Sequence, residues 1–230
     1  MMGFVIDSVF FGMFLSLLAY EIGLVVKRKC KWAICNPLLI AIVLVIVVLL
    51  IFRIDYDTYY NGAQYLNYFL TPATICLAIP LYEKIKLLKK NWKAILAGIL
   101  SGVLSTLVGV LVIALVFSLE HSQYVTLLPK SITTAIGIGV SQELGGIPTI
   151  TVAVIILSGI FGNMFGEILC RWFRIKDPVA KGIAIGSASH AIGTARAMEL
   201  GAVEGAMSSL SIAVSGLITV VGASIFAQFL

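Results

Sequence analysis

Ionisable side chains interrupt an apolar sequence in the stretch GSASHAIGTARAMELG, residues 186–201, which contains His190, Arg196 and Glu199. A glycine between the histidine and the arginine permits a helix break. A half-helix that begins near Thr194 would direct backbone N–H groups and a positive dipole toward an anion. Because an arginine can bind a carboxylate through two parallel hydrogen bonds, this spacing predicts a site for a small carboxylate.

The same stretch has a second interpretation, in which it is a polar packing hinge. On a continuous helix Arg196 and Glu199 are i,i+3 neighbours and would neutralise each other at the membrane surface. Ionisable residues inside a membrane mark functional sites by default, so we predict substrate binding here. The predicted substrate-binding residues of the stretch are His190, Arg196, Thr194, Ser189 and Gly193, and Glu199 is a predicted coupling residue.

A second polar stretch covers residues 129–146. Its hydroxyl groups are predicted to contact the same ligand or, in the alternative, to bond their own i−4 backbone carbonyls. Glu143 is either the carrier of a coupling proton or a solvated loop end, and Lys130 is expected at the outer rim. The predicted ligand hydroxyls are those of Ser131, Thr133 and Thr134.

Two further features place polar or helix-breaking groups within apolar segments. Asn163 and Glu167 are i,i+4 neighbours in an apolar helix, where they would share one face. We predict that this face points toward a cavity and takes part in proton or ion coupling. Pro72 and Pro80 each remove a backbone donor from one segment, which indicates either a simple kink or a broken helix that crosses the site.

The elements that must position these residues are membrane-spanning helices. Of the 230 residues, 60% are hydrophobic and 12% charged, and the mean hydropathy is +1.07, whereas soluble domains are about half apolar and a quarter charged. We predict an all-α integral membrane protein with about six spanning helices of sufficient length, plus two broken or re-entrant Gly-rich segments at 129–146 and 182–200. The predicted spans are 4–26, 33–53, 62–83, 94–118, 148–172 and 205–229.

The distribution of charge predicts how the chain crosses the membrane. Basic residues are concentrated at 27–31, 84–93 and 171–181. The positive-inside rule places these clusters in the cytoplasm, so the net charge of +5 is a topology signal and not a nucleic-acid footprint. Segment 129–146 must then enter and return on the outer side, because one helix alone separates the outer loop 119–128 from the third cluster. Segment 182–200 either re-enters from the inside or spans.

Short sequence matches recur at offsets of 56 and 57 residues. The matching pairs are 135–137 with 191–193, 143–145 with 199–201, 100–102 with 157–159, Gly109 with Gly166, and Pro72 with Pro129. Two of these matches lie inside the two Gly-rich segments, which the charge pattern inserts from opposite faces. Oppositely inserted, Gly-interrupted segments are typical of inverted-repeat transporters whose site lies at the membrane midplane.

The runs LLPKSITTAIGIGVSQELGGIPTIT and FRIKDPVAKGIAIGSASHAIGTARAMELG, together with LTPATICLAIPLYE upstream, resemble the LrgB/CidB family of membrane proteins. The resemblance covers essentially the whole chain, with departures from the family pattern at Ala135 and Gly139. It implies either holin/antiholin-like regulation of murein hydrolase activity and autolysis, or transport of short organic acids, as in relatives similar to the plastid glycolate/glycerate translocator. It also implies a small LrgA- or CidA-like membrane partner.

Together, the residues and the resemblance predict a secondary transporter subunit for small monocarboxylates such as pyruvate, glycolate, glycerate or lactate. The alternative is an antiholin-like regulator. We expect a plasma-membrane homo-oligomer, with a helical pair at 1–61 for scaffold or oligomer contacts and a transport-like core at 62–230. The sequence shows no nucleophile–base pair, metal-ligand spacing or nucleotide loop, so we predict no enzyme activity, no catalytic residue, no metal, no cofactor and no nucleic-acid partner.

Overall fold

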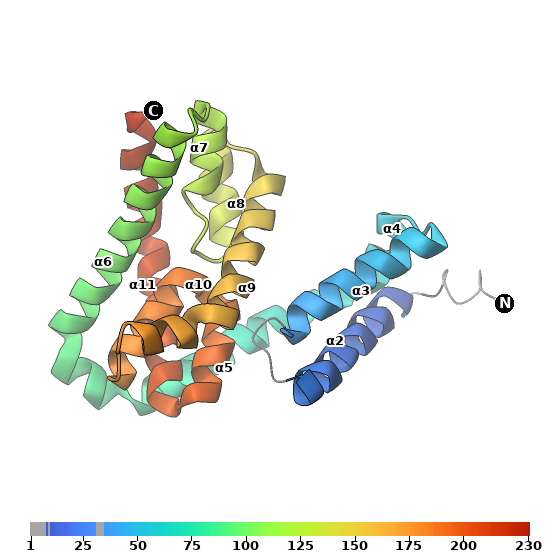
Figure 1. Ribbon diagram of the computed structural model, residues 1–230, viewed down its shortest axis with the longest axis horizontal. Coiled ribbons are helices and arrows are strands. Elements are labelled where there is room, and N and C mark those ends of the chain that lie inside the picture. The colour runs from blue at the N-terminus through green and yellow to red at the C-terminus, as the bar shows by residue number, and fades with distance from the viewer. Residues whose placement is uncertain (1–7, 9, 31–34) are drawn as a thin grey trace. The chain divides into compact units, whose positions relative to one another are not determined.

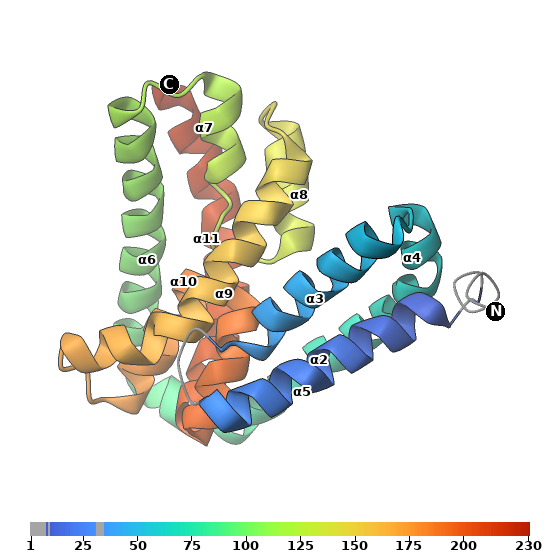
Figure 2. The same cartoon turned by 45° about the vertical axis from the view of Figure 1, so that its right-hand side comes forward.

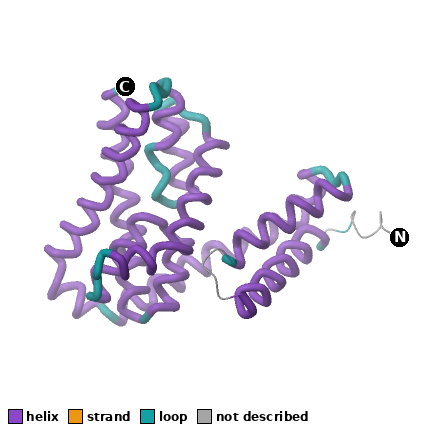
Figure 3. The backbone as a smooth tube through the Cα atoms, in the orientation of Figure 1, coloured by secondary structure: helices purple, strands orange, loops and turns teal. Residues whose placement is uncertain are grey.

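A computed structural model describes residue 8, residues 10–30 and residues 35–230. All the regular structure in these ranges is helical, as Figure 3 shows, and the chain divides into two compact units, Met1–Cys76 and Leu77–Leu230. The predicted all-α architecture is therefore confirmed. The predicted spans at 4–26 and 33–53 begin among residues outside the described ranges.

The first unit is built on a pair of helices, α2 (Phe11–Cys30) and α3 (Pro37–Phe52), followed by α4 (Tyr56–Ala63) and η1 (Gln64–Phe69). The side-chain oxygen of Asn36 caps α3 by accepting bonds from the backbone N–H groups of residues 38 and 39. Glycines let other backbones approach α2 closely, because a Cβ at Gly12 would meet the carbonyl of Tyr59 and one at Gly23 would meet Pro37. The division between the two units lies within α5 (Leu70–Glu83), and the separate roles of a helical pair at 1–61 and a core at 62–230 stay a prediction.

The second unit contains every segment in which we predict substrate-binding or coupling residues. Its helices after α5 are α6 (Ile85–Val116), α7 (His121–Leu127), α8 (Thr134–Glu143), α9 (Pro148–Trp172), α10 (Pro178–Leu200), α11 (Ala202–Phe226) and η2 (Ala227–Phe229). Its hydrophobic core joins one face of α6 to α7 and α11, with Ile99, Leu107, Tyr124 and Met207 among the fully buried side chains. In Figure 1, α7 and α8 lie at the end of this unit where the C-terminus is, and α10 lies toward the opposite end.

Three of the described helices are long and apolar enough to cross a membrane, namely Ile85–Val116, Pro148–Trp172 and Ala202–Phe229. They correspond to three of the roughly six predicted spans. Helix α3 is apolar but has 16 residues, and α5 has 14, whereas a span needs about 20. Helix α2 has 20 residues, but Lys27, Arg28 and Lys29 occupy its last turn.

The first Gly-rich segment forms a helical hairpin, which we call hairpin 1 (residues 121–143, α7 and α8). Helix α7 runs against the end of α11, where the Tyr124 hydroxyl donates to the carbonyl of Phe226. Helix α8 runs antiparallel to α9, since Ser141 bonds Thr151 while Gly137 packs on Ile155 further along α9. Both ends of hairpin 1 therefore lie at one end of the unit, and the turn at 128–133 lies inside it (Figure 2).

Helix α10 is also a hairpin, which we call hairpin 2 (residues 178–200). Its backbone breaks at Ser189 and at His190, which has φ 41° and ψ −141°. In the first half, α10a (178–188), Gly186 packs on Ser208 of α11. In the second half, α10b (191–200), the Thr194 hydroxyl bonds Ser208, and Met198 lies against Gly205 nearer the start of α11. Gly182 of α10a packs on Glu204, so the contacts of α10 move along α11 from Glu204 to Ser208 and then back to Gly205. The chain therefore reverses at the break, and α10 is not a single spanning helix.

The two hairpins belong to an inverted internal repeat. Adding 57 to the bounds of hairpin 1, 121 and 143, gives 178 and 200, which are the bounds of α10. The helices that follow the hairpins, α9 and α11, run in opposite directions (Figure 1). The end with the basic segments 84–93 and 171–181 receives both ends of hairpin 2, and the other end receives both ends of hairpin 1. We call the first of these the basic end.

Candidate functional site

The turns of both hairpins meet at one residue of α9, Ile155. A Cβ added at Gly137 of hairpin 1 would overlap Cδ1 of Ile155 and would lie 3.6 Å from the carbonyl oxygen of Pro129. From hairpin 2, Nε2 of His190 lies 2.9 Å from the carbonyl oxygen of Ile155. Ile155 is fully buried and follows Pro148 by seven residues, a depth of about 10 Å along α9. We call this meeting point the hairpin junction.

His190 holds the turn of hairpin 2 against α9. Its side chain is buried, and because a carbonyl can only accept, Nε2 donates to Ile155. The ring also packs on Gly159, where an added Cβ would lie 2.8 Å from it. A positive φ at a non-glycine residue is strained and is typical of functional sites. The described contacts thus place His190 at the junction, with one ring nitrogen hydrogen-bonded within the protein.

The small polar residues around His190 are bonded within the protein. The Ser189 hydroxyl donates to the carbonyl of Ile185, at 2.6 Å. The Thr194 hydroxyl lies 2.9 Å from the carbonyl oxygen of His190 and 2.7 Å from the hydroxyl of Ser208. Gly193 leaves no room for a Cβ beside Ser189. The structure therefore brings these predicted site residues together, with hydroxyls that bond i−4 carbonyls.

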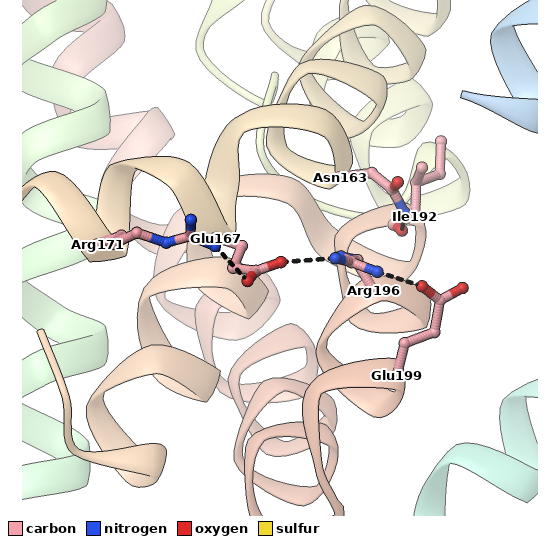
Figure 4. Close-up of polar contacts among 6 residues, drawn as sticks. All are labelled: Asn163, Glu167, Arg171, Ile192, Arg196 and Glu199. Carbon is pink, nitrogen blue, oxygen red and sulfur yellow. Dashed lines mark hydrogen bonds and ion pairs between the residues drawn. The ribbon is translucent and has the colours of Figure 1, made fainter. Parts of the chain in front are cut away.

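Arg196 lies further along α10b, in an ion-pair network between α9 and α10 (Figure 4). Its Nη2 atom is 2.5 Å from Oε2 of Glu167, and its Nη1 atom is 2.5 Å from Oε2 of Glu199. Arg171 donates to the other oxygen of Glu167, at 3.0 Å. Two guanidinium groups and two carboxylates are thus linked. Sequence spacing predicted Glu199 as the partner of Arg196, and the structure adds a second partner, Glu167, from α9.

The ion-pair network is separated from the junction along α10b. Arg196 follows His190 by six residues, a distance of about 9 Å along a helix. Between them, the side-chain amide of Asn163 donates to the carbonyl of Ile192 at 2.7 Å, as Figure 4 shows. The α9 partners of hairpin 2 therefore follow one another toward the basic end, from Ile155 to Asn163 and then Glu167.

The predicted hydroxyls of hairpin 1 lie in its turn and at the start of α8. Ser131 is buried and lies 3.1 Å from the ammonium of Lys130. Thr133 is the N-cap residue of α8, although its side chain makes no capping bond, and Thr134 begins the helix. Glu143 is exposed at the last position of α8, about 13 Å from Thr134 by helix rise.

Lys130 lies in the inner turn of hairpin 1 and not at the outer rim. The prediction was wrong because it began the re-entrant segment at residue 129. In the structure the first half of the hairpin is α7, which covers His121–Leu127, so residue 129 already lies in the turn. A sequence signal for this entry existed. Glu120 and Gln123 form a capping box at the start of α7, a pattern of residues three apart that marks a helix N-terminus.

A groove of 540 Å³ lies between α6 and α10a. It is lined by small residues, among them Gly98, Gly102, Ser105, Ala180 and Ala184. Ser187 faces this groove, while Ser189 faces Gly162 of α9. The groove and the hairpin junction thus contact different faces of hairpin 2. Among the described residues, no basic side chain lines the groove, so it is not the predicted carboxylate site.

The described ranges offer no alternative centre built on a metal ion. Within residues 8, 10–30 and 35–230, no cluster of His, Cys, Asp and Glu suited to a metal ion is present. The hairpin junction and the neighbouring ion-pair network remain the candidate site in the second unit.

Comparison with known proteins identifies relatives over nearly the full chain. The model of the LrgB-like family matches residues 16–229. A protein of Bacillus mycoides named antiholin-like protein LrgB is 39% identical over 222 residues, which cover 96% of each chain. Proteins of the same name from Bacillus cereus and Bacillus anthracis are 38% identical over the same extent. No solved structure matches the chain.

Proposed function

Because the chain belongs to the LrgB-like family of membrane proteins and carries two opposed hairpins, we propose that it is a secondary transporter subunit for small monocarboxylates. The substrates would be of the pyruvate, glycolate, glycerate or lactate type. One observation carries the proposal, namely that hairpins entering from opposite ends bring their turns to the same residue, Ile155. Broken helices that meet within an inverted repeat form the substrate sites of many transporters.

The hairpin turns carry polar groups that would bind a small carboxylate. We assign substrate contacts to the junction and the residues beside it, which are His190, Ser189, Gly193, Thr194, Ser131, Thr133 and Thr134. Arg196 would also receive a carboxylate, on condition that it releases one of its two present partners. Movement of α10b relative to α9 would break the same ion pairs, so we assign coupling to Glu167, Glu199 and Asn163, with Glu143 as a further candidate.

The proposed membrane arrangement follows the distribution of charge. The basic end would face the cytoplasm of a cell whose plasma membrane holds the protein as a multi-pass chain. Hairpin 1 would then open to the outside and hairpin 2 to the inside. We further propose that the chain works with a small LrgA- or CidA-like membrane protein and forms homo-oligomers, with the first unit available for these contacts.

Uptake by proteoliposomes tests the transport proposal. We expect saturable uptake of labelled pyruvate or glycolate, by the protein alone or with its small partner. Arg196→Lys should reduce uptake severalfold, because a point charge does not replace a planar fork that joins two carboxylates. The matched control is Arg174→Lys, which changes an exposed arginine outside the network. Unchanged uptake in Arg196→Lys would remove this residue from the proposed site.

A second candidate function is antiholin-like regulation of murein hydrolase activity, and the names of the relatives favour it. Such a regulator requires no saturable site for a solute. It would change the rate of autolysis in cells even when Arg196 or the junction residues are substituted. Autolysis that responds to the protein, combined with no saturable uptake of any small monocarboxylate, would place this function ahead of transport.

A further inference from the structure

We propose that Lys130, in the turn of hairpin 1, is the cation that binds the carboxylate of the transported monocarboxylate. This inference rests on the proposed transport function and deepens it, because it names the principal charged ligand. It also gives the carboxylate a site at the hairpin junction that does not require the ion pairs of Arg196 to break.

The position of Lys130 within the fold makes its charge costly unless the charge has a function. Lys130 follows Pro129, whose carbonyl oxygen lies beside Gly137, and Gly137 packs on Ile155. Ile155 is about 10 Å along α9 from its start, so the turn that carries the ammonium lies well inside the second unit. Charged groups at membrane depth are expensive and usually belong to substrate or ion pathways.

The present partner of Lys130 does not neutralise it. Its ammonium lies 3.1 Å from the neutral hydroxyl of Ser131. No carboxylate of the described residues forms an ion pair with it, whereas Arg196 already contacts two carboxylates. Lys130 is half-buried, and a partly buried charge without an opposite charge is less favourable than a paired one, so an incoming carboxylate would gain more at Lys130 than at Arg196.

The groups around Lys130 suit an anion. Ser131 contributes a buried hydroxyl. The first turn of α8 begins at Thr134 and has no side-chain cap, so its N–H groups lack the partners that a helix interior would provide. These N–H groups and the ammonium favour the same sign of charge. The hydroxyls of Thr133 and Thr134 lie on the same short segment and could bond the 2-oxo or 2-hydroxy group of a substrate.

The internal repeat places the second hairpin turn opposite. Thr133 immediately precedes α8, and His190 immediately precedes α10b, so the two residues occupy similar places in their hairpins. His190 contacts the carbonyl oxygen of Ile155, whose side chain Gly137 of hairpin 1 approaches. A carboxylate on Lys130 would therefore have both turns as neighbours. One cation for one carboxylate would favour monocarboxylates, since a second carboxylate would remain unpaired.

The test measures uptake and binding of pyruvate and glycolate by Lys130→Met and Lys130→Arg in proteoliposomes and in detergent. Loss of a charge-assisted bond should raise the KM and the Kd roughly 10- to 100-fold in Lys130→Met, and Lys130→Arg should recover most of the affinity. Lys176→Met is the matched control, because it removes an exposed lysine from a loop and should leave both constants unchanged.

A cysteine variant separates loss of the charge from loss of the fold. Lys130→Cys should bind weakly until it reacts with a methanethiosulfonate that carries an ethylammonium group. The thiolate attacks the reagent, forms a mixed disulfide and releases methanesulfinate, which leaves a cation of similar length at this position. The reagent with a sulfonate in place of the ammonium should not restore binding. The unsubstituted protein, treated identically, corrects for reaction at its exposed cysteines, Cys30 and Cys76.

The outcomes distinguish this inference from the transport proposal. Saturable uptake that survives Lys130→Met with an unchanged KM would overturn the role of Lys130 and leave transport intact. Binding that depends on Lys130 without any uptake would retain the site and overturn transport. Absence of both binding and uptake in the folded, unsubstituted protein, with its partner present, would overturn both. Restored binding after ethylammonium treatment supports the inference directly.

Discussion

Hairpin 1 and hairpin 2 have the same length and the same place in the internal repeat, yet they hold their charges differently. In hairpin 2, Arg196 joins two carboxylates, and one of them, Glu167, belongs to α9. In hairpin 1, Lys130 has a neutral serine hydroxyl as its partner. The comparison teaches that hairpin 2 uses its cation to hold two helices together, whereas the cation of hairpin 1 has no carboxylate partner among the described residues, as the proposed role of Lys130 requires.

Each hairpin is also bound to the helix that follows it by a bond between two hydroxyl groups. Thr151 of α9 lies 2.7 Å from the hydroxyl of Ser141 in hairpin 1, and Ser208 of α11 lies 2.7 Å from the hydroxyl of Thr194 in hairpin 2. Adding 57 to 151 gives 208, so the two anchoring hydroxyls occupy equivalent positions. The repeat therefore keeps the contacts that position each hairpin on the helix that follows it, and varies the groups in the turns.

The largest expected effect is the loss of stability when a glycine at a hairpin contact is replaced by alanine, and the loss should differ between the two hairpins. A Cβ at Gly186 would overlap the backbone carbonyl oxygen of Ser208, whereas one at Gly137 would meet the flexible end of Ile155. We expect Gly186→Ala to cost about 3 kcal/mol of stability or to prevent folding, and Gly137→Ala to cost less. Thermal unfolding in detergent measures both.

Gly109→Ala is the control for this pair, because a Cβ there meets nothing within 4 Å. Its melting temperature should remain the same or rise, since alanine favours a helix over glycine by roughly 0.5–1 kcal/mol. Equal losses in Gly186→Ala and Gly137→Ala would contradict the unequal packing of the hairpins.

An intermediate effect is expected at the two anchoring hydroxyls. Thr151 lies within bonding distance of the Thr126 carbonyl and the Ser141 hydroxyl, so Thr151→Val leaves buried groups with fewer partners, at a cost of about 1–2 kcal/mol. Ser208→Ala should cost less, because the hydroxyl of Thr194 keeps its bond to His190. Chemical or thermal unfolding of the two variants checks the order, and a larger loss in Ser208→Ala would reverse it.

The smallest expected effect concerns the outermost member of the ion-pair network. The Arg171 side chain is 76% exposed, and an exposed ion pair contributes about 0–1 kcal/mol. Arg171→Gln should therefore leave the melting temperature nearly unchanged, while Glu167→Gln, which removes the carboxylate that Arg196 contacts on α9, should lower it. A marked loss of stability in Arg171→Gln would show that the network acts as one unit.

Part of the candidate site could be predicted from sequence spacing. The pairing of Arg196 with Glu199 follows from i,i+3 spacing, and the glycine-rich composition marked both hairpin segments as unlike ordinary spanning helices. The contact of Arg196 with Glu167 could not be predicted in the same way. It depends on α9 and α10b lying side by side, and the two residues are 29 positions apart.

The position of Lys130 was predicted wrongly for a different reason. The distribution of charge predicted a re-entrant segment but not the position of its turn. That position depends on α7, which is only seven residues long. The residues of α7 carry little apolar periodicity that would separate them from a loop. Starting the segment at the proline therefore moved its lysine from the inner turn to the rim.

By itself, the sequence determined the helical class, the membrane environment, the positions of the polar segments and the repeat that relates them. These properties follow from composition, from local periodicity and from the clustering of basic residues, all of which act within a few helical turns. The tertiary structure decided that α10 reverses at His190, that both turns meet at Ile155, and that Arg196 joins two carboxylates while Lys130 contacts a serine hydroxyl. Such contacts join residues far apart along the chain, and their energies depend on which backbones approach closely enough to touch.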